Sequence, residues 1–388
     1  MPIAQTPPDW KKEWCEIDDA TYLNTASRGP MPRTILRAVQ ASLDAYRSPH
    51  RIGDGTFFDV PNRLRASLAT LIGARPAEIA LTTGASTGMA TVSQLLDWRP
   101  GDEIITAKDE FPVQYSTWKP MEQREGVILK IVAPRGRFIT ADDLIEAITP
   151  RTRAVSVSHV RFDDGTLLDA ARVAAACRAH GAVLVLDVSQ SCGAMPLDVE
   201  ELGADFLVCA GYKWLLSPSG TGFFWVRSDH LANVRRGPFY WTAQDAGTFS
   251  ALNFLDPKPS HEAKRWDAAE ATTHFNLNLT AMDAAVDVVL RIGPGSVREH
   301  NRQLIERLFD RLPDNCVRAS PLDPAERGPY GCFTGPTADD TVALYQRLRK
   351  EGVVVSMRGG RIRVSPHLFN STEDIDHLVR IVSTSPPL

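Results

Sequence analysis

The segment from Ala154 to Arg227 constrains the fold more than any other part of the chain. Its β-rich runs AVSVSHV, AVLVLDV, FLVCAG and GTGFFWV alternate with a stretch from Asp169 to His180 whose apolar residues recur every three or four positions. Such alternation predicts a parallel or mixed sheet covered by helices. Upstream, EIALTTG, DEIITA and VILKIVA are typical of further strands. We therefore expect an α/β architecture that begins near residue 78.

The character of the sequence changes near residue 280. AMDAAVDVVLRIG and SVREHNRQLIERLFDRL predict two amphipathic helices separated by GPGS. After them we expect a strand at GCFTG, a helix at TVALYQRLRKEG, a strand pair joined by a Gly-Gly turn, and a last helix with Thr372 as its N-cap. The predicted organisation is an N-terminal arm over 1–20, a large α/β domain over 21–279 and a smaller α+β domain over 280–388.

Charge and composition narrow the range of partners. The chain has 43 Lys and Arg against 47 Asp and Glu, which gives a formal net charge of −4. Neither nucleic acid nor an anionic membrane surface is attracted by such a balance, so a small-molecule partner is favoured. No apolar run has the length of a signal peptide or membrane span, and a cytoplasmic location is expected. The six cysteines show no zinc-ligand spacing, so we predict free, mostly buried thiols and no metal site.

Three signals that are weak when taken singly lie at the ends of predicted strands. Lys213 occupies a turn between two buried strands, where desolvation would keep its amine partly neutral, as Schiff-base chemistry requires. Asp187 ends the strand VLVLD at the edge where open α/β sheets bind ligands. The run Gly84 to Thr87 begins a helix, and backbone N–H groups there can bind a phosphate. Taken alone, Lys213 could also be an ordinary turn lysine whose amine is in water. Asp187 alone could also bind a metal or a ribose hydroxyl. Together they match the requirements of pyridoxal 5′-phosphate (PLP).

With these motifs the sequence resembles the class V aminotransferase family of PLP enzymes, which includes cysteine desulfurases, selenocysteine lyases, kynureninases and isopenicillin N epimerases. The resemblance runs from YLNTASRGPMP at Tyr22 to SPHLFNSTEDID at Asp376. It implies fold type I, with a mostly parallel seven-stranded sheet in the large domain. It also implies a homodimer whose active sites lie at the subunit boundary and act on an amino acid.

The resemblance also implies how PLP would be bound. In LVLDVSQS, Asp187 would partner the pyridine nitrogen and Gln190 would hydrogen-bond the ring hydroxyl. In AGYKWLLSPSGTGF, Lys213 would form the aldimine and Tyr212 would reach the phosphate. Phe111 in DEFPVQYSTW would stack on the ring. The other residues expected at the phosphate are Ala85, Ser86, Thr87 and, from the neighbouring subunit, Thr272 in AEATTHFN.

On the substrate side, the resemblance implicates Asn24 and Ala26 in YLNTAS and His159 in SHV. Arg363 in GRIRVSPHLFN would bind the substrate α-carboxylate through two parallel hydrogen bonds and fix which Cα bond is broken. Cysteine desulfurases need a nucleophilic cysteine shortly before this motif, but the corresponding SMRGGRIRVS contains none. Cys332 lies earlier, in a predicted strand, and is interpreted as a packing residue. Persulfide-forming desulfuration is therefore disfavoured.

The implied reaction passes through an external aldimine and a Cα carbanion, with Lys213 as the general base. An aminotransferase or a C–S (β-eliminating) lyase is the preferred hypothesis. The alternative is an epimerase or another Cα-directed tailoring enzyme of secondary metabolism. A catalytically silent PLP-fold binding protein is the least favoured hypothesis, because Lys213, Asp187 and Arg363 are all present.

Overall fold

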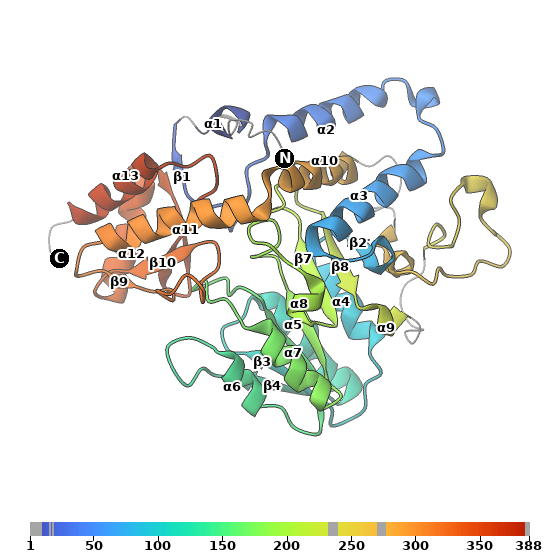
Figure 1. Ribbon diagram of the computed structural model, residues 1–388, viewed down its shortest axis with the longest axis horizontal. Coiled ribbons are helices and arrows are strands. Elements are labelled where there is room, and N and C mark those ends of the chain that lie inside the picture. The colour runs from blue at the N-terminus through green and yellow to red at the C-terminus, as the bar shows by residue number, and fades with distance from the viewer. Residues whose placement is uncertain (1–9, 15–16, 18, 232–239, 270–276, 385–388) are drawn as a thin grey trace, which may run out of the picture.

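A seven-stranded sheet forms the centre of the computed structural model, which describes residues 10–14, 17, 19–231, 240–269 and 277–384 (Figure 1). The strand order is β2-β8-β7-β6-β5-β3-β4, and only β8 runs antiparallel to its neighbours. The predicted mostly parallel seven-stranded sheet is confirmed. Its strands are β2 (Ile79–Thr82), β3 (Glu103–Ala107), β4 (Ile128–Val132), β5 (Thr152–Ser158), β6 (Val183–Asp187), β7 (Phe206–Ala210) and β8 (Gly222–Val226).

Helices cover both faces of this sheet because its strands are apolar on both sides. In β6, Leu184 and Leu186 belong to one buried cluster, whereas Val183 and Val185 belong to another. Side chains alternate across a strand, so each face of the sheet requires its own layer of helices. The first cluster is covered by α3 (Thr56–Ile72), α6 (Ala141–Glu146), α7 (Ala170–Ala179) and α10 (Leu277–Ile292), and the second by α4 (Ala85–Leu95) and α5 (Pro112–Glu125).

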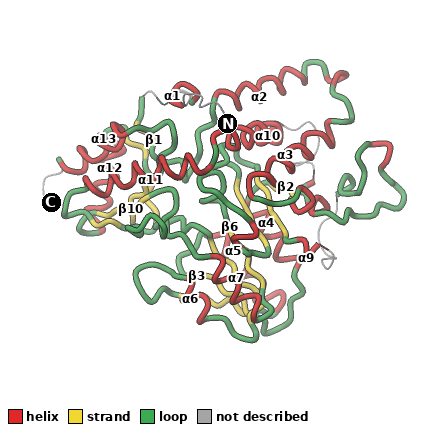
Figure 2. The backbone as a smooth tube through the Cα atoms, viewed as in Figure 1, coloured by secondary structure: helices red, strands yellow, loops and turns green. Residues whose placement is uncertain are grey.

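A second unit is built mainly from the C-terminal part of the chain (Figure 2). Its four-stranded sheet has the order β12 (Ser356–Arg358), β13 (Arg361–Val364), β10 (Gly331–Thr334), β9 (Val317–Arg318). The helices around it are α11 (Pro294–Arg311), α12 (Ala338–Lys350) and α13 (Thr372–Ser383). The start of the chain joins this unit, because β1 (Thr21–Tyr22) pairs in parallel with β11 (Val353–Val354).

The first residue of the last helix corrects one expectation. The N-cap of α13 is Ser371 and not Thr372, because Ser371 has extended backbone angles and forms a capping box with Asp374. The other helices of the described ranges are α1 (Trp10–Glu13), α2 (Arg33–Ala45), α8 (Val199–Leu202) and α9 (Ser228–Leu231), with 3₁₀ turns at Pro49–Arg51, Pro76–Glu78, Phe249–Ala251 and Ala263–Trp266. None of these described helices combines the length and hydrophobicity needed to span a bilayer.

A cluster of buried aromatic rings joins the N-terminal segment to both units. The His367 ring lies 5.1 Å from Trp14, 6.0 Å from Trp214 and 5.9 Å from Phe369, measured between ring centroids. Trp214 also stacks on Tyr330, with centroids 6.4 Å apart. Burial lowers the pKa of His367 to about 3, so the ring stays neutral at neutral pH.

The neutral state of His367 predicts a loss of stability in weak acid. An unfolded histidine protonates near pH 6.5 and His367 only near pH 3, so the unfolded chain binds more protons as the pH falls between these values. We expect Tm to fall as the pH is lowered from about 6.5 towards 5, above the range in which most carboxylates titrate. In His367→Gln, Tm should fall less steeply with decreasing pH than in the wild type, although the Tm of this variant at pH 7 will be lower than that of the wild type. His50→Gln, at an exposed position, should retain the wild-type slope; equal slopes in all three proteins would contradict the prediction.

Candidate active site

Lys213 lies between β7 and β8, at the carboxyl edge of the large sheet, where backbone segments approach very closely. A Cβ atom on Gly29 would come within 2.0 Å of the Lys213 carbonyl oxygen. A Cβ atom on Gly222 would come within 2.6 Å of Gly84 Cα. Glycine at these positions lets the N-terminal segment approach the Lys213 backbone and lets the turn before α4 approach the start of β8.

The amine of Lys213 is buried and has no hydrogen-bond or ion-pair partner among the described residues. The side chain is 7% exposed, and Nζ lies 5.1 Å from the Phe111 ring centroid and 5.9 Å from that of Tyr212. Burial lowers the pKa of Lys213, while the Asp187 carboxylate partly opposes this effect. The amine is therefore easier to deprotonate than an exposed lysine, as nucleophilic attack on a carbonyl requires.

Asp187 ends β6, as the strand pattern predicts, and Gln190, which only the family resemblance implicates, lies three residues further on. An oxygen of the Asp187 carboxylate accepts a 2.8 Å hydrogen bond from the Ser189 amide. The Gln190 amide nitrogen donates to the Ala26 carbonyl at 3.0 Å, and its oxygen accepts from Trp214 Nε1 at 2.9 Å. Gln190 is thereby fixed between the N-terminal segment and the residue that follows Lys213.

The N-terminus of α4 provides a place for an anion. Gly84 precedes the helix with φ of 153°, a backbone conformation that favours glycine. The backbone N–H groups of Ala85, Ser86 and Thr87 donate to no acceptor within the described parts of the chain. Thr87 Oγ1 lies 2.7 Å from Thr83 Oγ1. Free amides and the helix dipole together stabilise a phosphate at such a position.

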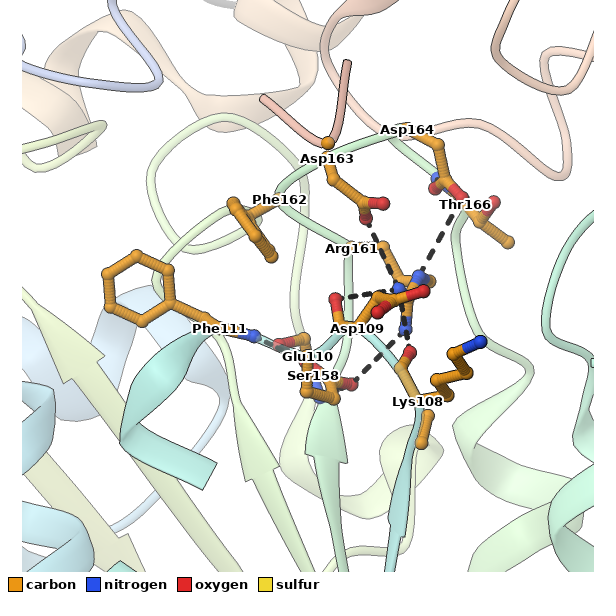
Figure 3. Close-up of polar contacts among 12 residues, drawn as sticks. Lys108, Asp109, Glu110, Phe111, Ser158, Arg161, Phe162, Asp163, Asp164 and Thr166 are labelled. Atoms are coloured by element: carbon orange, nitrogen blue, oxygen red, sulfur yellow. Dashed lines mark hydrogen bonds and ion pairs between the residues drawn. The ribbon is translucent and has the colours of Figure 1, made fainter. Parts of the chain in front are cut away.

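Phe111 lies beside a charged cluster that sequence reasoning missed (Figure 3). The Glu110 carboxylate accepts hydrogen bonds from the Ser158 amide at 2.9 Å, the Ser158 hydroxyl at 2.6 Å and the Phe111 amide at 3.3 Å. Burial raises the pKa of Glu110, and Arg161 partly opposes this effect. We define the charged cluster as Glu110, Arg161, Asp163 and Asp164. The signal available in the sequence was the concentration of charge in DEF and RFDDG, next to predicted strand ends.

Arg363 is a buried cation without a carboxylate partner in the described part of the protein. It is 1% exposed, its Nη1 donates to the Phe162 carbonyl at 2.8 Å, and its Nη2 donates to Ser27 Oγ at 3.3 Å. Its Nε has no partner among the described residues. Burial lowers the pKa of Arg363. Because a buried charge is costly unless it is paired, this fork of donors is suited to an incoming carboxylate.

The other predicted substrate-side residues lie around the same edge. His159 Nδ1 lies 3.0 Å from Ser191 Oγ, and burial lowers the pKa of His159 to about 4, so that its ring is neutral. The backbone of Asn24 pairs with that of Ser365 in an isolated parallel β-bridge. The side-chain Oδ1 of Asn24 is buried and has no hydrogen-bond partner in the described ranges. The Ala26 carbonyl contacts Gln190. Thr272 lies outside the described residues.

These groups fit PLP when they are considered as a set of donors and charges. A buried free amine faces an aromatic ring, a carboxylate stands at a strand end, and a helix N-terminus offers unpaired amides. PLP presents an aldehyde, a pyridine nitrogen and a phosphate, which are complementary to these three features.

A model of the family described as aminotransferase class-V matches residues 21–381. The chain belongs to this family. It is 27% identical to an isopenicillin N epimerase of Amycolatopsis lactamdurans, over 95% of this chain and 96% of the relative. It is 29% identical to a kynureninase of Deinococcus radiodurans, over 84% and 80% of the two chains. The fold matches that of a solved cystine C–S lyase, C-DES, in complex with cysteine persulfide, with a TM-score of 0.85, 24% identity and coverage of 96% and 99%.

As a member of the class V aminotransferase family, the protein is a PLP-dependent enzyme. The predicted family, fold type, cofactor and class of Cα chemistry are therefore confirmed. The roles of individual residues stay predictions, as do the domain boundaries at 20 and 279.

Proposed function

We propose that Lys213 and Arg363 form the reactive pair of a PLP-dependent amino acid enzyme. Arg363 binds the substrate α-carboxylate, and the Lys213 amine removes the proton from Cα. The observation that carries the proposal is that two cationic side chains, Lys213 at the carboxyl edge of the large sheet and Arg363 on β13, are both buried and within electrostatic range of each other, and that neither has a carboxylate bound to it within the described ranges. A general base with a lowered pKa is effective near neutral pH.

In the same proposal, the cofactor is held by residues that lie at or after the ends of four strands, β2, β3, β6 and β7. PLP, when bound, supplies an electron sink for the Cα bond that is broken. Asp187 would keep the ring nitrogen protonated, Gln190 would hydrogen-bond the ring hydroxyl, Phe111 would contact the ring and Tyr212 would bind the phosphate. The remaining proposed phosphate ligands are Ala85, Ser86, Thr87 and, from a partner subunit, Thr272.

The first candidate reaction is transamination or β-elimination at a C–S bond. Both begin with one proton removal at Cα, for which Lys213 provides a single base. Epimerisation is the second candidate, because relatives named isopenicillin N epimerase, from Amycolatopsis lactamdurans and Streptomyces clavuligerus, are 27% and 28% identical to this chain. We also propose that the protein forms a homodimer with shared active sites and that it is located in the cytoplasm.

A panel of L- and D-amino acids, including cysteine and cystine, tests these alternatives in ²H₂O. Exchange of the Cα proton, followed by NMR, reports the shared first step. Pyruvate with ammonia identifies a lyase, a keto acid formed only with an amino acceptor identifies an aminotransferase, and inversion alone identifies an epimerase. A PLP-loaded protein that exchanges no Cα proton with any member of the panel would overturn the proposal.

Cys332 is not expected to take part in the reaction. Its thiol is buried in β10, its Sγ donates to the Asp163 carbonyl at 3.4 Å, and burial raises its pKa to about 12. The reactive thiolate is therefore absent at neutral pH. Cys332→Ser should retain full turnover, as should Cys316→Ser, which changes another buried cysteine of the same unit. Complete loss of turnover in Cys332→Ser alone, with Tm preserved, would instead indicate persulfide chemistry.

A further inference from the structure

The hairpin of β12 and β13 places three arginines on one face. Gly359 and Gly360 form its turn, with φ of 52° and 73°, as a two-residue turn of type I′ requires. The register pairs Arg358 with Arg361 and Ser356 with Arg363. Because side chains alternate across a strand, Arg358, Arg361 and Arg363 all lie on the same side of the hairpin.

Only one of the three guanidinium groups has a carboxylate partner within the described residues. Arg361 Nη1 lies 2.8 Å from Asp163 Oδ2. Arg358 donates from Nη2 to Ser27 Oγ at 3.1 Å and from Nη1 to the Met357 carbonyl at 2.9 Å. Arg363 also donates to Ser27 Oγ, at 3.3 Å. Arg358 and Arg363 thus both donate to the uncharged hydroxyl of Ser27. Because no carboxylate lies between them, the repulsion between the two positive charges is offset only weakly.

The α-carboxylate assigned to Arg363 does not account for Arg358. Arg363 has an unpartnered Nε beside Nη2, so one edge of its guanidinium suffices for both oxygens of a carboxylate. Arg358 reaches the same hydroxyl from the other strand of the hairpin. Both arginines also act electrostatically on Lys213, whose pKa they lower after the larger effect of burial. Arg358 therefore lies beside Arg363, with the Nη2 atoms of both side chains at the Ser27 hydroxyl.

We propose that Arg358 binds a second anionic group of the substrate, a carboxylate at the end of its side chain. This inference rests on the proposed function and narrows its substrate class to amino acids with a carboxylate at each end. The two Nη2 atoms are held within hydrogen-bond distance of one Ser27 oxygen, a separation that a short dicarboxylic acid spans. Arg358 is then the residue that distinguishes such substrates from neutral amino acids.

Calorimetric titration of the PLP-loaded protein with glutarate and butyrate tests this assignment without any turnover. Wild-type protein should bind glutarate roughly 10- to 100-fold more tightly than butyrate, since the second carboxylate gains hydrogen bonds to a charged donor. Arg358→Gln should abolish the preference and leave butyrate binding unchanged. Arg363→Gln should weaken both ligands. Ser27→Ala retains both cations and should retain the preference, as should Arg349→Gln, which removes an exposed arginine of α12.

Two results would overturn the assignment: wild-type protein that binds glutarate no better than butyrate, or a preference that survives in Arg358→Gln. Failure of the proposed function is distinguishable from either. If the protein bound glutarate through Arg358 but exchanged no Cα proton with any amino acid, the anion site would stand and the proposed reaction would fall.

Discussion

Replacing Lys213 with alanine is expected to abolish the borohydride-reducible chromophore of the PLP-loaded protein and to lower kcat by roughly 10³-fold or more. The reason is that Lys213 carries the buried free amine at the edge of the sheet, and within the described ranges no second lysine contacts the Phe111 ring. The absorbance spectrum and the rate of Cα proton exchange are the two measurements. A large effect is expected because the proposed function assigns both cofactor attachment and proton removal to this one amine.

Lys119→Ala is the matched control for this variant. Lys119 lies on α5, is exposed and pairs with Glu122, so its loss should change neither the spectrum nor the exchange rate. Removal of a buried unpaired amine should not lower Tm greatly, because desolvation disfavours the charge there. A Lys213→Ala protein that retained the chromophore would show that another residue holds the cofactor.

Arg363→Gln is expected to lower kcat/KM by roughly 10²- to 10³-fold while the spectrum of bound PLP stays unchanged. Glutamine keeps much of the side-chain volume but loses the charge and the two-donor edge that the α-carboxylate needs. Steady-state kinetics on the best amino acid of the panel measures the loss. Both kcat and KM should change, because the carboxylate contact both binds the substrate and orients its Cα bond.

The control for Arg363 is Arg311→Gln, which removes an exposed arginine of α11 that pairs with Asp376. Its kinetic constants should equal those of the wild type. If Arg363→Gln altered the PLP spectrum or left kcat/KM intact, the α-carboxylate would have to be bound elsewhere.

Local sequence patterns were sufficient for the α/β class and for most strands of the large sheet, while the family resemblance supplied the seven-stranded architecture and most of the proposed site residues. The change from an apolar run to polar residues marks the end of a strand, and this pattern singled out Asp187 and Lys213, whereas Gln190 was implicated only by the family resemblance. The pattern could not identify β1 as a partner of β11, because these two-residue strands are more than 300 positions apart and carry no periodicity. Nor could it decide between Ser371 and Thr372, since both residue types cap helices.

The electrostatic part of the site was less accessible from the sequence. Whether an arginine is paired depends on tertiary contacts, and the sequence RGGRIR gives no reason why Arg361 meets Asp163 while Arg358 and Arg363 do not meet a carboxylate. The charged cluster beside Phe111 likewise depends on tertiary contacts, because it joins Glu110 to residues about 50 positions further along the chain. Burial and pairing of charge are properties of the assembled fold.

The backbone of Ala26 has a mechanical consequence. Its amide donates to Ser365 Oγ in the C-terminal unit at 3.1 Å, and its carbonyl accepts from Gln190 at the edge of the large sheet. The backbone of Ala26 therefore connects the C-terminal unit to the large sheet through two hydrogen bonds. Because Gln190 is a proposed cofactor contact and Arg363 a proposed substrate contact, we expect a displacement of the C-terminal unit to be transmitted through Ala26 to Gln190.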